Sequence, residues 1–224
     1  MSHAQEAAPV SSTDQADESE LDAVALSALI SSRVCHDLIN PVGAIGSGLE
    51  VLDDPAMEET MRDAALTLIR SGAKKALALL SYARLAYGSA GGFGAQISME
   101  DAQKALTELY DTTKADLDWQ IGGGLAAKEN VKALMVLAYA AADCIPRGGT
   151  VSITGDISDF EITASGKKLL LQDDLVRALN GDATELAPKF TPALLVHKLV
   201  TGAKGKIAVE KSEEKVTFKA AFSA

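Results

Sequence analysis

Aromatic side chains and positive charge are both scarce in this sequence of 224 residues. Aromatic residues make up only 4% of the chain, so we expect a core built from alanine, leucine, valine and isoleucine. The 21 lysines and arginines are outnumbered by 31 aspartates and glutamates, and the formal net charge is -10. Because nucleic acids and anionic membranes attract clusters of positive charge, this composition argues against either as a partner.

Long hydrophobic runs and cysteines are also lacking. No apolar run reaches the roughly 18 residues that a membrane helix needs, and the polar, acidic N-terminus does not have the pattern of a signal peptide. Cys35 and Cys144 are the only cysteines, and both lie on apolar faces of predicted helices. This placement favours buried, reduced thiols over a disulfide. Together these features predict a cytoplasmic protein.

Two stretches lack the periodicity of helices and strands. Residues 1–20 contain no lysine or arginine and are rich in small, polar and acidic residues, which predicts a disordered acidic tail. Residues 89–95 continue a glycine-rich sequence that begins at Gly88. A glycine run can cradle a phosphate, but no strand precedes this one and no Lys-Ser/Thr pair follows it, so we predict a linker. Two structured regions are left, residues 21–88 and residues 96–224.

The first structured region contains a long periodic segment from Leu21 to Leu52. Its apolar positions recur at alternating steps of three and four, the spacing of a helix in a bundle or coiled coil. They are Leu21, Val24, Ala28, Ser31, Cys35, Leu38, Val42, Ile45, Leu49 and Leu52. The opposite, outward face is then formed by Arg33, His36, Asn40, Gly43, Ser47 and Glu50. We therefore expect an exposed histidine with an arginine one turn before it and an amide one turn after it.

Pro41 lies in the interior of this predicted helix, five residues after His36. Proline has no N–H, so the carbonyl of Asp37 loses its helical partner, the helix bends, and the cost is about 3 kcal/mol. A lone histidine on a helix is usually an ordinary surface or core residue. Here the exposed position, the acidic neighbour and the unfavourable proline together indicate a functional histidine.

A second helix is predicted to start at Asp54 or Pro55, with Glu58 and Glu59 near its positive N-terminal end, and to run to about Tyr87. The two helices then form an antiparallel hairpin with a very short loop. One hairpin cannot bury the apolar rows of both its helices, whereas two copies can do so as a four-helix bundle. We therefore expect a homodimer. The alternative is a hairpin covered only by its own second domain.

The second region alternates between strands and helices. We predict helices at 100–114, 128–145, 172–179 and 191–201. We predict strands at 97–99, 117–121, 151–155, 160–165, 206–210 and 216–222, with the last two paired as a hairpin. This order predicts an α/β sandwich, a sheet with helices on one face. With the helical hairpin before it, the whole chain belongs to the α+β class.

The sequence His36-Asp37-Leu38-Ile39-Asn40-Pro41 resembles the H-box of two-component histidine kinases. The longer stretch from Arg33 to Ile45 resembles a narrower family, the ChpT-type histidine phosphotransferases of alphaproteobacterial phosphorelays. The resemblance implies a dimeric four-helix bundle followed by a degenerate kinase ATP-binding domain, the Bergerat fold. It also implies a phosphoryl group on His36 that is exchanged with receiver-domain aspartates. No cofactor is then bound by this chain, and Mg²⁺ comes from the receiver.

The nucleotide-binding positions of the kinase domain are not matched. The stretch from Ile145 to Ile153 resembles the junction after the kinase N-box, which aligns the N-box asparagines with Val136 and Ala140. Ala164 replaces the aspartate of the first glycine box, Lys168 replaces its second glycine, and Phe190 and Pro192 occupy glycine positions of the last box. Valine and alanine have no oxygen ligand for Mg²⁺, and bulky side chains fill the space that a phosphate needs. We therefore predict a domain without nucleotide binding.

In this interpretation the residues around His36 have separate roles. Asp37 orients the other ring nitrogen, Arg33 pairs with the phosphohistidine, and Asn40 hydrogen-bonds a phosphate oxygen or a water. A receiver helix is expected to dock on Ile39, Gly43, Ala44 and Ser47. The resemblance implies that the donor is the receiver domain of a hybrid histidine kinase and that the acceptors are response regulators of the cell cycle. His197 has no acid or amide at helical spacing, so we expect a surface or hydrogen-bonded histidine without a catalytic role.

Two other functions stay open at this point. The first is an ATP-dependent histidine kinase with an unusual pocket, which measurable ATP binding would favour. The second is a non-catalytic dimeric adaptor or inhibitor that binds a receiver or a kinase. It predicts receiver binding without phosphate on His36.

Overall fold

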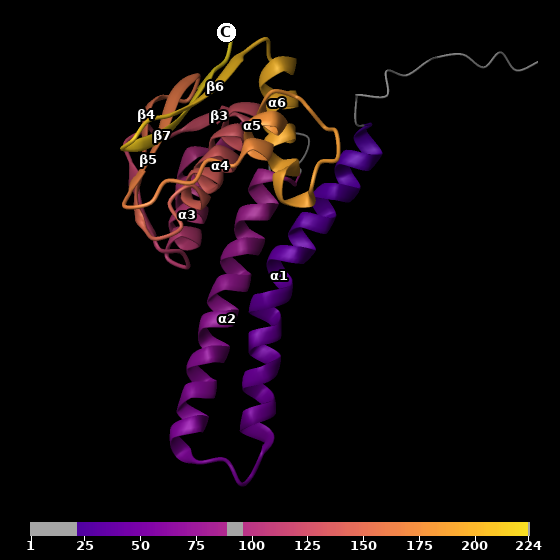
Figure 1. Ribbon diagram of the computed structural model, residues 1–224, viewed down its shortest axis with the longest axis vertical. Coiled ribbons are helices and arrows are strands. Elements are labelled where there is room, and N and C mark those ends of the chain that lie inside the picture. Colours follow the sequence, from indigo (N-terminus) through magenta and orange to yellow (C-terminus); the bar gives the residue numbers. More distant parts are fainter. Residues whose placement is uncertain (1–21, 89–95, 224) are drawn as a thin grey trace, which may run out of the picture.

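The computed structural model describes residues 22–88 and 96–223. The predicted tail of residues 1–20 and the predicted linker of residues 89–95 lie outside the described residues. The first described part is a hairpin of two long helices, α1 (Ala23–Asp53) and α2 (Glu59–Ala86). The hairpin projects well beyond the α/β domain that follows it (Figure 1). The predicted hairpin and α/β sandwich are both confirmed.

The ends of the hairpin helices are set by short polar side chains. Asp22 caps α1 by accepting a hydrogen bond from the Ala25 N–H over 2.6 Å. The second helix begins at Glu59, later than the predicted start at Asp54 or Pro55. The reason is that Asp54 holds a turn: its side chain accepts from the Ala56 N–H over 2.9 Å, and its carbonyl accepts from the Met57 N–H over 3.2 Å.

Two glycines allow α1 and α2 to pack closely. A Cβ added to Gly72 would lie 2.7 Å from the Pro41 carbonyl oxygen, and one added to Gly48 would lie 2.6 Å from Ile69 Cγ1. The helix α1 continues through Pro41, which is buried. Pro41 therefore lies on the face that packs against α2, as Gly48 does, and the hairpin has backbone-to-backbone contact at this level.

The α/β domain is built on one five-stranded sheet. The strands are β2 (Ala115–Trp119), β4 (Gly149–Asp156), β5 (Asp159–Gly166), β6 (Lys206–Lys211) and β7 (Lys215–Ala221). Their order is β2-β4-β5-β7-β6, with β2 parallel to β4 and every other pair antiparallel. Five of the six predicted strands therefore form one sheet, and the predicted closing hairpin is β6 with β7.

Helices cover one face of this sheet. They are α3 (Met99–Tyr110), α4 (Lys128–Asp143), α5 (Asp173–Leu179) and α6 (Thr191–Gly202), with a short 3-10 helix, η1 (Pro188–Phe190), before α6. One strand, β3 (Leu125–Ala127), was not predicted; it pairs with β1 (Gln96–Ser98) as a separate two-stranded ribbon. Three residues directly after a glycine run have too few side chains to show an alternating pattern.

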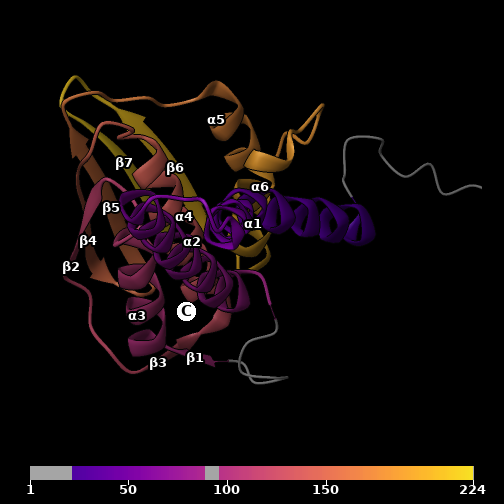
Figure 2. The ribbon, with the colours of Figure 1, turned by 90° about the horizontal axis from the view of Figure 1, so that it is seen from below.

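The molecule has three layers, with the sheet on one side, the helices of the α/β domain in the middle and the hairpin on the other side (Figures 1 and 2). Side chains of β4 and β5 that alternate inward, such as Val151, Ile153 and Ile162, are fully buried. On the other side, α2 packs on α3 and α4, and α1 packs on α6 and η1. The second domain therefore contacts one side of α1, the side that carries Arg33. No helix in the described part of the chain has the length and apolar character to span a membrane.

Candidate functional site

His36 lies on α1 with its side chain 77% exposed, as the sequence predicted. Its Nδ1 atom is 3.5 Å from Oδ1 of Asp37. Asn40, one helical turn further on, is exposed as well. The ring therefore turns one nitrogen toward a carboxylate, which leaves Nε2 as the nitrogen available to a partner.

Asp37 is held in place from its other side. Its side chain is only 16% exposed, and its Oδ2 accepts a hydrogen bond from Arg33 Nε over 2.7 Å. This spacing of four residues on one helix is favourable for an ion pair. The two carboxylate oxygens thus have different partners, an arginine on one and the histidine ring on the other, so the carboxylate has little freedom to rotate.

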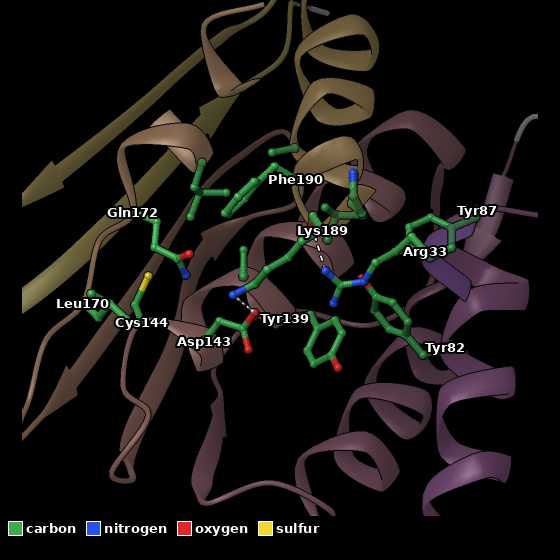
Figure 3. A pocket seen from close by; sticks show the side chains of 15 residues that line it. Arg33, Tyr82, Tyr87, Tyr139, Asp143, Cys144, Leu170, Gln172, Lys189 and Phe190 are labelled. Carbon is green, nitrogen blue, oxygen red and sulfur yellow. Dashed lines mark hydrogen bonds and ion pairs between the residues drawn. The ribbon is translucent and has the colours of Figure 1, made fainter. Parts of the chain in front are cut away.

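The prediction that Arg33 shares the outward face with His36 is wrong. Arg33 is buried, with 8% of its surface exposed, and its guanidinium points toward the α/β domain (Figure 3). There Nη1 donates to the Lys189 carbonyl over 2.7 Å, and the guanidinium carbon lies 5.9 Å from the centre of the Tyr139 ring. The apolar period of α1 places Arg33 opposite the apolar row, but η1 and α6 pack on α1, and Arg33 is enclosed between them and the Tyr139 ring of α4.

The prediction that both cysteines are buried is half wrong. Cys144 is buried, and burial raises the pKa of its thiol to about 12. Cys35 is exposed. Val42 and Leu49 in the same row are 54% and 48% exposed. Both thiols are free, as the sequence predicted.

The residues predicted to contact a receiver follow His36 along α1 and differ in exposure. Ile39 is 67% exposed, Gly43 and Ser47 are exposed, and Ala44 is half-buried. Ala44 and Asn40 line one side of a groove of about 450 Å³. The other side is lined by Ser71, Lys74, Lys75, Thr112 and Thr113. These five residues come from α2 and from the loop after α3, so only the tertiary fold brings them to the site.

Four of the six positions compared with kinase nucleotide boxes meet at one small cavity. Val136, Ala140, Phe190 and Pro192 all line it, together with Tyr139. The cavity has a volume of about 40 Å³, room for a few water molecules. Ala164, the counterpart of the adenine-reading aspartate, is fully buried in the sheet core instead. Hydrophobic side chains and Arg33 occupy the space between α4, η1 and the hairpin (Figure 3).

His197 is a packing residue, in agreement with the prediction. Its Nδ1 lies 2.9 Å from the Leu179 carbonyl oxygen, so that nitrogen carries the proton and donates. Gly181, at φ +90°, lies against the ring, where an added Cβ would be 2.6 Å from Nε2. Within residues 22–88 and 96–223, no cluster of three or more His, Cys, Asp or Glu side chains has the arrangement of a metal site.

Comparison with known proteins gives concordant matches in sequence and in structure. A model of the histidine phosphotransferase C-terminal domain family matches residues 99–215. The protein phosphotransferase ChpT of Brucella abortus (strain 2308) is 36% identical over 211 residues, which are 89% of this chain and 97% of that protein. A solved structure of a bacterial phosphotransferase has a TM-score of 0.80 and 33% sequence identity, and the match covers 90% of this chain and 98% of that one. The likeness therefore includes the hairpin as well as the α/β domain.

Proposed function

This chain belongs to the family of ChpT-type histidine phosphotransferases, and we propose that it carries the phosphoryl group on Nε2 of His36. The group passes between aspartates of receiver domains, and no ATP is used. The observation that carries this assignment is an exposed imidazole whose Nδ1 faces a fixed carboxylate at 3.5 Å. A carboxylate at that place favours the tautomer with the proton on Nδ1, so the lone pair is on Nε2.

The transfer step follows from this geometry. The Nε2 lone pair attacks the phosphorus of an aspartyl phosphate in line, the N–P bond forms, and the P–O bond breaks, so that the aspartate leaves as a carboxylate. The ring then carries a positive charge, which the neighbouring Asp37 carboxylate stabilises. The reverse step returns the phosphoryl group to another receiver aspartate. Asn40, exposed one turn along the helix, hydrogen-bonds a phosphate oxygen or a water.

The partner supplies what this chain does not. Phosphoryl transfer depends mainly on positioning and on neutralising charge, so a receiver brings Mg²⁺, a lysine and the phosphorylated aspartate. Its docking helix lies on Ile39, Gly43, Ala44 and Ser47, where three of the four side chains are small. In a phosphorelay of this kind the donor is the receiver of a hybrid histidine kinase, and the acceptors are response regulators of the cell cycle. The reaction then takes place in the cytoplasm.

Independence from ATP is supported by the cavity between α4 and η1. A volume of about 40 Å³ is far below the several hundred Å³ of an ordinary ligand site. Val136 and Ala140 also offer no oxygen to Mg²⁺ at this cavity. An ATP-dependent kinase predicts saturable ATP binding, which a calorimetric titration detects directly.

A homodimer is supported by uncovered apolar rows on both helices of the hairpin. On α1, Val42 and Leu49 are seven residues apart and about half exposed; on α2, Leu77 and Leu80 are 65% and 49% exposed. Side chains at such spacings form one stripe along a helix. A second copy that packs its own stripe against this one completes a four-helix bundle and removes these side chains from water.

The experiment that tests the proposed function uses a phosphorylated receiver domain and Mg²⁺ without ATP. The wild-type chain is expected to become phosphorylated, and His36→Ala is expected to bind the receiver without being labelled. His197→Gln is the matched control and should accept label normally. Label on His36→Ala would show that the site is wrong. Receiver binding without label on the wild type would favour the adaptor function.

A further inference from the structure

Arg33 connects two parts of the molecule that are far apart in sequence. It starts on α1, one turn before His36, and its Nη1 reaches the carbonyl of Lys189 in η1 at 2.7 Å. The same guanidinium lies over the Tyr139 ring of α4 at 5.9 Å (Figure 3). Planar guanidinium groups stack on aromatic rings and donate in fixed directions. The orientation of Arg33 is thus set by the α/β domain.

The Nε side of the guanidinium contacts the H-box. Arg33 Nε donates to Asp37 Oδ2 over 2.7 Å, and Asp37 Oδ1 lies 3.5 Å from His36 Nδ1. A continuous series of contacts therefore runs from the Lys189 carbonyl through Arg33 and Asp37 to the imidazole. Each contact in the series has a defined direction, because guanidinium and carboxylate are both planar.

We infer that Arg33 is a positioning residue through which the α/β domain fixes the carboxylate of Asp37 and, through it, the tautomer and orientation of His36. This inference rests on the proposed function of His36 as the phosphoryl acceptor. It gives the α/β domain a part in the chemistry although its counterpart of a nucleotide pocket is closed. A displacement of η1 or α4 relative to the hairpin alters the reactivity of the histidine.

The charges around the guanidinium are consistent with this assignment. Burial acts against the charged form of Arg33, but its interactions with the Asp37 carboxylate and, to a smaller extent, with Tyr87 and Tyr139 leave its pKa raised. Tyr82, Tyr87 and Tyr139 line the same cavity as uncharged phenols. Asp143 and Lys189 pair with each other at the rim, 3.8 Å apart and nearly half exposed. Asp37 is thus the carboxylate that forms the direct ion pair with Arg33, and the two residues hold each other.

A lysine cannot take over this arrangement. The guanidinium presents separate N–H groups to Asp37 and to the Lys189 carbonyl. A lysine ammonium is a compact charge on one nitrogen, without the planar group that stacks on a ring. Arg33→Lys therefore keeps an ion pair with Asp37 and loses the directed contact with η1 and the stacking on Tyr139. Arg33→Met loses all three contacts. The two variants separate the charge of Arg33 from its link to the α/β domain.

The test combines ring ¹⁵N NMR of His36 with single-turnover transfer from a phosphorylated receiver. We expect the Nδ1–H tautomer to dominate in the wild type and to lose population in Arg33→Met, with a transfer rate lower by roughly 10-fold or more. Arg33→Lys should restore most of the tautomer but only part of the rate. The receiver concentration at half-maximal rate should stay within about twofold, since the docking surface is untouched.

Arg62→Met is the matched control. Arg62 is another hairpin arginine that donates to a carbonyl, that of Leu52 at 3.1 Å, but it is only half-buried and lies at the far end of the hairpin. Its loss should leave the His36 tautomer and the transfer rate unchanged. If the population of the Nδ1–H tautomer of His36 in Arg33→Met equals that in the wild type, the inference is overturned. If Arg33→Met does not fold, the transfer rate of Arg33→Lys decides, and a rate equal to that of the wild type would overturn the inference.

A double-mutant cycle tests the link to the α/β domain. Tyr139→Leu should slow transfer when Arg33 is present and have little further effect in Arg33→Lys, because both changes break the same series of contacts. Independent, multiplicative effects would mean that Arg33 does not transmit the position of α4. The proposed function fails separately: phosphate on His36→Ala would refute it, whatever the tautomer measurements show.

Discussion

Asp37 is the side chain whose chemistry is most closely tied to that of His36. Asparagine in its place keeps an oxygen for Arg33 but turns an N–H₂ group toward His36 Nδ1, which favours the tautomer with its proton on Nε2. We therefore expect Asp37→Asn to slow single-turnover transfer by on the order of 10–100-fold. Rapid-quench measurement of receiver dephosphorylation gives this rate.

Asp37→Ala is the comparison that isolates the tautomer. Alanine removes the carboxylate without adding a donor, so the ring is left unconstrained and the loss should be smaller than that of Asp37→Asn. An Asp37→Asn variant that transfers at the wild-type rate would show that the carboxylate does not control the ring. In both variants the buried Arg33 loses the carboxylate with which it pairs. Circular dichroism checks that α1 is still folded.

Four tyrosines, all of those in the chain, give the protein a measurable response to alkali. Burial raises the pKa of Tyr87 and of Tyr139 to about 12, and it also raises those of Tyr82 and Tyr110. The folded state binds these protons more tightly than the unfolded state, whose phenols titrate near a pKa of about 10. This contribution to stability is complete below about pH 10 and is lost as the pH rises toward 12.

The expected result is that tyrosinate absorbance and loss of helical circular dichroism change together between pH 10 and 12. Tyr139→Phe should reduce the absorbance change without moving the start of the transition to lower pH. Ionisation near pH 10 with the helical signal intact would contradict the burial of these phenols.

The hairpin depends on the close approach of α1 and α2 at Gly72. Alanine is favoured over glycine in a helix by up to about 1 kcal/mol, but a Cβ at this position would lie 2.7 Å from the Pro41 carbonyl oxygen. The helices must then move apart, so we expect Gly72→Ala to lower the free energy of unfolding by roughly 1–3 kcal/mol. Urea denaturation measures the change.

Gly43→Ala is the matched control on α1, where an added Cβ meets nothing within 4 Å. It should raise stability by up to about 1 kcal/mol through helix propensity alone. Equal stabilisation by both alanines would mean that the helices do not touch at Gly72. Because Gly43 is also a predicted docking residue, slower transfer by the more stable Gly43→Ala would support receiver docking there.

The elements that the sequence predicted well are those with long, regular periods. Both hairpin helices and the order of the α/β domain follow from apolar spacing and turn residues, and His36 is exposed as its place outside the apolar row indicated. The prediction for Arg33 failed because the apolar period of a helix indicates a single buried face. The helix α1 packs on two partners, α2 and the α/β domain. η1 comes from more than 150 residues further along the chain, as the Arg33–Lys189 contact over 156 positions shows. No local pattern contains that contact.

The oligomeric state follows from the surface of the whole hairpin. Leu49→Glu and Leu77→Glu each place a charge in the proposed interface, so we expect either to produce monomers by sedimentation at concentrations where the wild type is a dimer. Thr67 is exposed, and Thr67→Glu adds the same single negative charge, so this variant should leave the dimer intact. A wild-type monomer would mean that the α/β domain of the same chain is the only cover for the hairpin, leaving these apolar rows in water.

The proposed function depends on a single N–P bond. After transfer from a phosphorylated receiver, tandem mass spectrometry at neutral pH together with ³¹P and ¹⁵N NMR locates the phosphoryl group. We predict one phosphohistidine, His36, substituted at Nε2 with the proton kept on Nδ1 facing Asp37. Phosphate on another residue, or on Nδ1 of His36, would contradict it.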